Sequence, residues 1–155
     1  MLELTLKNRR NKDIMKPKVL IVDDDPNIIE LLEGYLSKDY DILKAHDGKE
    51  AIIIVEANPP DIILLDIIMP GINGYKVCKK LKDDPKTNHI PIVIVTSLNE
   101  TKDRNKAIEA GADDFVTKPF DIIELTVRVR SHLRTKLYYD TMLGNPSFHL
   151  HLLVL

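Results

Sequence analysis

The stretch 61–70, DIILLDIIMP, places one aspartate, Asp66, inside an apolar run rich in isoleucine. A short run of this kind, bounded by turn-forming residues, predicts a strand buried on both faces. A carboxylate at the end of such a strand is costly to bury unless a cation or a hydrogen-bond donor meets it. Taken alone, Asp66 would simply cap the loop that follows, as aspartates after strands usually do. The other strand ends decide between these interpretations.

Three further apolar runs end in polar side chains. They are KVLIVDDDP (18–26), IPIVIVTS (90–97) and DDFVTKPF (113–120), which end in Asp23 and Asp24, in Thr96, and in Lys118. Carboxylates, a hydroxyl and an ammonium form one site only if the strands are parallel. In open α/β sheets, ligands bind in the crevice at the carboxyl ends of parallel strands. The four runs together therefore predict one site rather than four unrelated loop residues.

Strand and helix patterns alternate five times along the chain. We expect strands at about 18–23, 40–45, within 61–70, at 91–96 and at 113–117, and helices at 26–37, 49–57, 75–82, 101–110 and 121–138. This alternation predicts an α/β fold: a doubly wound five-stranded parallel sheet of flavodoxin-like order 2-1-3-4-5, with helices on both faces. We expect a flexible leader at 1–16, a folded domain at 17–137, and a C-terminal tail or truncated linker at 138–155.

The last two predicted helices differ in how firmly they should be held. The helix at 101–110 offers only Ala107 and Ile108 as apolar anchors, so we expect it to be loosely packed. The last helix carries one apolar stripe from Ile122 to Leu137, and Lys136 is expected to lie away from that stripe.

Composition excludes several classes of function. The 155 residues carry a net charge of −2, which gives no electrostatic footprint for nucleic acid or for anionic membranes. No apolar run is long enough to span a membrane. The single cysteine, Cys78, excludes a disulfide within the chain and suits a reducing compartment. We therefore expect a cytoplasmic protein without direct nucleic-acid or membrane binding.

The predicted crevice has the chemistry of phosphoryl transfer. Its carboxylates repel one another unless a cation or protonation neutralises them. All the candidate ligands are hard oxygens, which selects Mg²⁺, or Mn²⁺, rather than zinc. An aspartate in such a site can itself accept a phosphoryl group and form an acyl phosphate.

The segments VDDDP, LLDIIMPGINGY, IVTS and GADDFVTKPF, with their spacing, closely resemble the receiver domain of two-component response regulators. The resemblance covers about residues 16–137, and the SHLRTKLYYD segment resembles the linkers of receivers that precede cyclic-dinucleotide synthase or other output modules. It implies a signalling switch rather than an enzyme. A sensor histidine kinase or phosphotransfer protein would be the phosphodonor, and a phosphorylation-dependent homodimer or a downstream effector would be the output.

The resemblance also assigns roles to individual residues. Asp66 would accept the phosphoryl group, and Asp24, Asp23 and the backbone carbonyl of Ile68 would join it in binding Mg²⁺. Lys118 would pair with the Asp66 carboxylate and then with the phosphoryl group. The resemblance also implies that the Lys118–Pro119 peptide bond is cis.

Two further residues would relay the signal. Thr96 would move to the phosphoryl oxygen and Phe115 would turn inward, altering the face formed by the fourth helix, the fifth strand and the fifth helix. The sequence departs from the common pattern at Phe115, which lacks the hydroxyl of the frequent tyrosine. It also has Ile68 and Leu98 where a polar side chain would orient the hydrolytic water, so we expect a long-lived phosphoryl group.

Three other classes fit the sequence less well. A haloacid-dehalogenase-type phosphatase also uses an aspartate and Mg²⁺, but it typically needs a second acid two residues after the nucleophile, where Ile68 lies. A pseudo-receiver scaffold is disfavoured by intact Asp66, Asp24 and Lys118. Flavin binding lacks a phosphate-cradling loop after the first strand.

Overall fold

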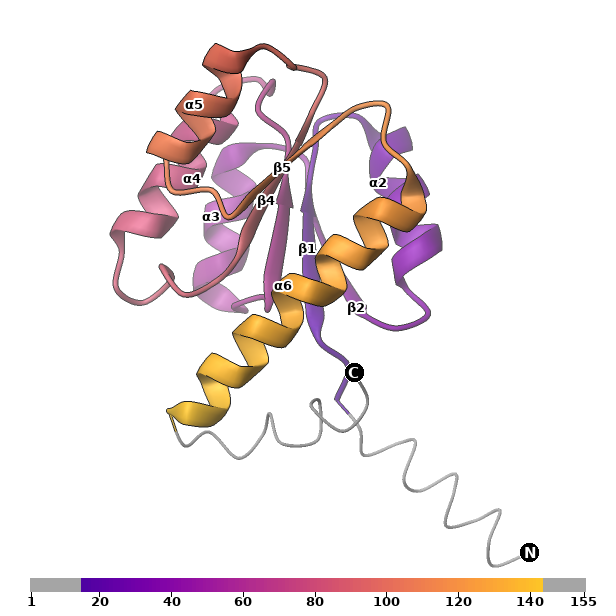
Figure 1. Ribbon diagram of the computed structural model, residues 1–155, viewed down its shortest axis with the longest axis vertical. Coiled ribbons are helices and arrows are strands. Elements are labelled where there is room, and N and C mark those ends of the chain that lie inside the picture. Colours follow the sequence, from indigo (N-terminus) through magenta and orange to yellow (C-terminus); the bar gives the residue numbers. More distant parts are fainter. Residues whose placement is uncertain (1–14, 144–155) are drawn as a thin grey trace, which may run out of the picture.

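The computed structural model describes residues 15–143 and shows one five-stranded parallel sheet (Figure 1). Every neighbouring pair of strands is parallel, and the order β2-β1-β3-β4-β5 confirms the predicted topology. The strands are β1 (Lys18–Val22), β2 (Asp41–Ala45), β3 (Ile62–Leu65), β4 (Ile92–Thr96) and β5 (Asp114–Thr117).

Helices cover both faces of the sheet. One face is covered by α2 and α6, and the other by α3, α4 and α5 (Figure 1). The helices are α2 (Pro26–Leu36), α3 (Gly48–Ala57), α4 (Gly74–Asp83), α5 (Thr101–Glu109) and α6 (Ile122–Met142).

Alternating side chains of the strands supply the two cores. In β1, Val19 and Ile21 pack on the α2/α6 side, whereas Leu20 and Val22 pack on the side of α3, α4 and α5. All four residues of β3 are buried, because this strand lies at the centre of the sheet with a helical layer on each face. The continuous apolar runs in the sequence follow from this double burial.

Helix starts are set by side-chain caps at the ends of the preceding loops. The carboxylates of Asp25, Asp47 and Asp121 and the amide oxygen of Asn73 accept hydrogen bonds from the backbone N–H groups that open α2, α3, α6 and α4. Pro26 occupies the first turn of α2, where its missing N–H costs nothing. The predicted start of each helix lies within one residue of the observed start.

The last two helices depart from the sequence expectations. Ile108 of α5 is 70% exposed, so it is no anchor, and the buried residues of that helix are Asp103 and Ala107. In α6, Lys136 is buried with the apolar stripe rather than lying away from it. The helix continues to Met142, beyond its predicted end at about residue 138.

The expected leader and tail lie mostly outside the described residues, in 1–14 and 144–155. Within 15–143, no helix is long and apolar enough to cross a membrane.

Candidate functional site

The sheet register brings Asp23 and Asp66 side by side. Val22 of β1 pairs with Leu65 of β3, and each aspartate is the next residue along its strand. The backbone N–H of Asp66 donates to the carbonyl of Val22 at 3.0 Å, which fixes the two strand ends against each other. The position of the two acids therefore follows directly from the register of the β1–β3 pair.

Three carboxylates share this edge of the sheet. One oxygen from each of Asp23, Asp24 and Asp66 lies within 4.8 Å of the others. Asp23 and Asp66 are 3% and 7% exposed, while Asp24 faces solvent. Like charges this close and this poorly hydrated destabilise one another, so the arrangement favours a bound cation.

Lys118 provides the one ammonium that contacts these acids among the described residues. Its Nζ lies 2.6 Å from Oδ2 of Asp23 and 3.4 Å from Oδ2 of Asp66. The predicted contact with Asp66 is present, but the shorter one is to Asp23. Burial raises the pKa of Asp23 above its ordinary value, against the opposing effect of the Lys118 hydrogen bond. Burial alone would lower the pKa of Lys118, but its contacts with Asp23 and Asp66 raise it, so the ammonium is retained at neutral pH.

The orientation of Asp66 is set by backbone groups. Its Oδ1 accepts a hydrogen bond from the N–H of Ile67 at 2.7 Å, and its Oδ2 is directed toward Lys118. The backbone carrying Asp66 packs directly against Gly74, the first residue of α4, whose N–H donates to the carbonyl of Ile67 at 3.0 Å. A Cβ on Gly74 would lie 2.2 Å from the carbonyl oxygen of Asp66, so only glycine fits there.

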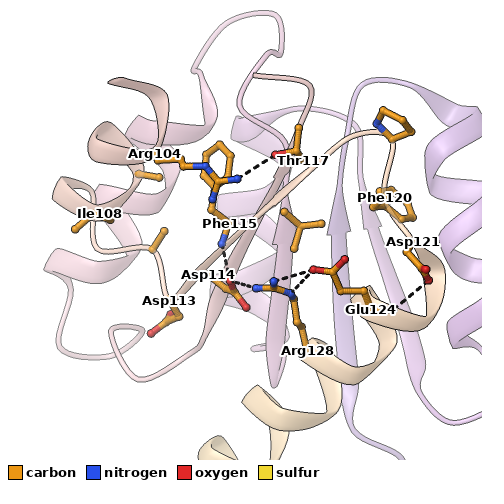
Figure 2. A pocket seen from close by; sticks show the side chains of 14 residues that line it. Arg104, Ile108, Asp113, Asp114, Phe115, Thr117, Phe120, Asp121, Glu124 and Arg128 are labelled. Atoms are coloured by element: carbon orange, nitrogen blue, oxygen red, sulfur yellow. Dashed lines mark hydrogen bonds and ion pairs between the residues drawn. The ribbon is translucent and has the colours of Figure 1, made fainter. Parts of the chain in front are cut away.

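Thr96 and Phe115 lie on the β4–β5 side of the same edge. Thr96 ends β4 and is fully buried, and its carbonyl accepts a hydrogen bond from the N–H of Lys118 at 2.7 Å. The Lys118–Pro119 bond is cis, as predicted. Phe115 is half-buried against the core, and the Arg104 guanidinium lies over its ring, 4.8 Å from the centroid (Figure 2).

The family model for the response regulator receiver domain matches residues 19–130. The chain belongs to this family. Response regulator PleD from Caulobacter vibrioides is 46% identical over 129 residues, which are 83% of this chain and 28% of PleD. The Synechocystis protein RpaA, described as a DNA-binding dual master transcriptional regulator, is 40% identical over 76% of this chain and 49% of its own length.

Solved structures agree with this assignment. A response regulator structure from Chloroflexus aurantiacus matches with a TM-score of 0.73 and 37% identity, covering 77% of this chain and 98% of that one. The receiver therefore corresponds to almost the whole of that solved chain but to half or less of PleD and RpaA.

Sequence reasoning brings together the acids of the receiver site and Lys118, but it misses three other features of the structure. The helix predicted at 75–82 leaves Gly74 in the loop before it, although Asn73 caps a helix that begins at Gly74. The position of Arg104 over Phe115 has no signal, because it depends on how α5 packs. The third feature is the pair of ion pairs made by Arg128 of α6, with Asp114 at 2.6 Å and with Glu124 at 2.8 Å. Figure 2 shows both contacts.

Proposed function

We propose that this receiver is a phosphorylation-controlled signalling switch that accepts a phosphoryl group on Asp66 from a sensor histidine kinase or a phosphotransfer protein. One observation carries the proposal: three carboxylates and Lys118 converge on the edge of the sheet where β3 ends in Asp66. In the transfer, a carboxylate oxygen of Asp66 forms a bond to phosphorus as the donor's N–P bond breaks. The imidazole nitrogen keeps the electron pair of the broken bond.

The donor set fits Mg²⁺, or Mn²⁺ in its place. Asp24 and Asp66 offer carboxylate oxygens, Asp23 lies within reach of both, and we assign the carbonyl of Ile68 as a backbone ligand. Such a hard dication would neutralise the acids and stabilise charge on the transferring phosphoryl oxygens. Lys118 contributes a second positive charge beside Asp66, where a phosphoryl oxygen of the product would accept its hydrogen bond.

The output of the switch is assigned to the face formed by α5, β5 and α6. Thr96 would hydrogen-bond the phosphoryl group, and Phe115 would turn into the space behind it. A pocket on this face runs between α5 and α6 and is lined by Arg104, Phe115 and Arg128, among others (Figure 2). Two states that differ here would present different surfaces for a homodimer or a downstream effector.

The phosphoacceptor role distinguishes this chain from an enzyme acting on many substrate molecules. The haloacid-dehalogenase alternative requires an acid two residues after Asp66, and Ile68 occupies that place with 53% of its surface exposed. The name of RpaA describes DNA binding by a protein about twice as long as the part matched here. That this chain has no nucleic-acid contact of its own, and that it resides in the cytoplasm, stay predictions.

Incubation with acetyl phosphate and Mg²⁺, followed by intact-mass measurement, tests the proposal. The wild type should gain one phosphate, and Asp66→Ala should gain none. Asp41→Ala is the matched control, since Asp41 is exposed at the start of β2, away from the acidic edge. A wild-type mass that stays unchanged, or an Asp66→Ala protein that is still phosphorylated, would contradict the assignment. Many turnovers per protein molecule would favour the phosphatase instead.

A further inference from the structure

The last turns of α6 hold a buried charged cluster at the edge of the sheet opposite Asp66. The family match ends at residue 130, but α6 continues to Met142, and Lys136, Leu137 and Asp140 of this extension are buried. Burying a lysine and an aspartate is costly unless each has a partner of opposite charge. The contacts of Lys136 and Asp140 therefore show how the end of α6 is held on the domain.

Lys136 connects α6 to the central strands. Its side chain is 5% exposed, it contacts Oδ2 of Asp140 one turn later, and its Nζ lies 3.7 Å from Oδ1 of Asp61. Asp61, directly before β3, is itself fixed to β1: its Oδ2 accepts from the N–H of Lys18 at 2.7 Å, and its own N–H donates to the carbonyl of Lys18 at 2.8 Å. The ammonium thus bridges the far end of α6 and the start of the strand that ends in Asp66.

A second contact holds the same part of the helix. The ring of Tyr139 stacks on His89, with centroids 5.5 Å apart and an angle of 16° between the planes. His89 belongs to the segment between α4 and β4, so this contact reaches a different part of the chain from Lys136. Two independent side-chain contacts therefore dock the extension against the base of the sheet.

Apolar packing alone fixes this end of α6 poorly. The buried stripe Leu125, Val129, Leu133 and Leu137 repeats every four residues with side chains of similar size, so a displacement of one turn exchanges like for like. A displacement that brought Asp140 to the place of Lys136 would instead set two carboxylates against each other beside Asp61. The charged cluster supplies the positional specificity that the stripe lacks.

We propose that Lys136, held between Asp61 and Asp140, is an anchor that fixes the far end of α6 to the start of β3. The folded unit of the receiver accordingly includes α6 to its last turn. Because the anchor lies at the opposite edge of the sheet from Asp66, it does not depend on the chemistry of the acidic site.

Amide hydrogen exchange of the full chain tests the anchor. Lys136→Met should raise exchange rates of residues 137–142 by about tenfold or more, because it leaves Asp140 buried without its ammonium. Asp61→Asn should raise them severalfold, since it removes the bridge to β3 but keeps the pair within α6. Lys79→Met is the control: the Lys79–Asp83 pair has the same i,i+4 spacing, but its side chains are 64% and 63% exposed.

The outcomes separate cleanly. Unchanged exchange in both Lys136→Met and Asp61→Asn would overturn the proposal. Loosening in Lys136→Met but not in Asp61→Asn would show that Lys136 acts within α6 alone, which also overturns it. If Lys136→Met does not fold, Asp61→Asn decides the question. Phosphorylation by acetyl phosphate should proceed in Asp61→Asn as in the wild type, so failure of the anchor and failure of the phosphoacceptor are read separately.

Discussion

Gly74→Ala should damage this receiver far more than its small size suggests. The first turn of α4 lies so close to the backbone of the phosphoacceptor loop that an added Cβ would be 2.2 Å from the carbonyl oxygen of Asp66 and 2.8 Å from Cα of Ile67. Carbon atoms in favourable contact are separated by about 3.5–4.0 Å, so α4 or the loop must move by roughly 1 Å. Both neighbours are backbone atoms, and neither can turn aside as a side-chain tip would.

The magnitude follows from the kind of clash. Forcing one extra carbon into a packed interior costs about 1–3 kcal/mol, and a contact with backbone belongs at the upper end, about 3 kcal/mol. Gly34 is the matched control, because it lies inside α2, where an added Cβ would meet nothing within 4 Å. There the same substitution should stabilise the protein by about 0.5–1 kcal/mol, since alanine favours helices over glycine.

Urea denaturation followed by circular dichroism measures both variants. At a slope of about 2 kcal/mol per molar, the midpoint of Gly74→Ala should fall by about 1.5 M and that of Gly34→Ala should rise slightly. Gly74→Ala should also be phosphorylated more slowly by acetyl phosphate, because the displaced loop carries Asp66. A Gly74→Ala protein with wild-type stability and wild-type phosphorylation would refute the argument that close backbone packing positions the phosphoacceptor.

Three further predictions concern hydrolysis, pH and thiol reactivity. Ile68→Asn together with Leu98→Glu should speed loss of the phosphoryl group about tenfold or more, because a polar side chain can orient water; an unchanged lifetime by intact mass would count against this. Burial raises the pKa of Asp23, so the folded protein binds a proton at this carboxyl more tightly than the unfolded chain does. The stability gained from that proton is present below pH 3.8 and is lost as the pH rises through the raised pKa. Denaturation midpoints without divalent cation should therefore fall with pH more in the wild type than in Asp23→Asn, and Mg²⁺ should reverse the fall. Burial raises the pKa of Cys78 to about 11, so iodoacetamide should label the native protein at neutral pH far more slowly than the protein in urea, and equal rates would contradict the buried position.

The fold is predictable because the three central strands carry clear signals in the sequence. The runs ending in Val22, Leu65 and Thr96 are apolar on both faces, and turn formers or caps separate each run from the next helix. Once the strands are parallel, the ends that carry polar residues must lie at one edge of the sheet. The convergence of Asp23 and Asp66 is therefore accessible from the sequence without any coordinates.

Side-chain pairing is less accessible, because it depends on distances that no local pattern encodes. Lys118 is expected to pair with Asp66, yet its shorter contact is to Asp23, at 2.6 Å against 3.4 Å. The sequence pattern puts Lys136 outside the stripe because lysine is rarely buried. Lys136 contacts Asp140, one turn later in α6, but it also contacts Asp61, which is far away in the sequence and which no local pattern connects to it.

Two lysines, one just before α6 and one near its end, contact the acids at the two ends of the central strand β3. β3 is flanked by acids, Asp61 before it and Asp66 after it. Lys118, shortly before α6, contacts Asp66, and Lys136, near the far end of α6, contacts Asp61. If phosphorylation of Asp66 draws Lys118 toward the new phosphoryl oxygens, the start of α6 moves while its far end stays attached to β3. The helix would then pivot about Lys136 rather than slide along the sheet, so the α5–β5–α6 face should change most next to the phosphorylated edge and least at the base.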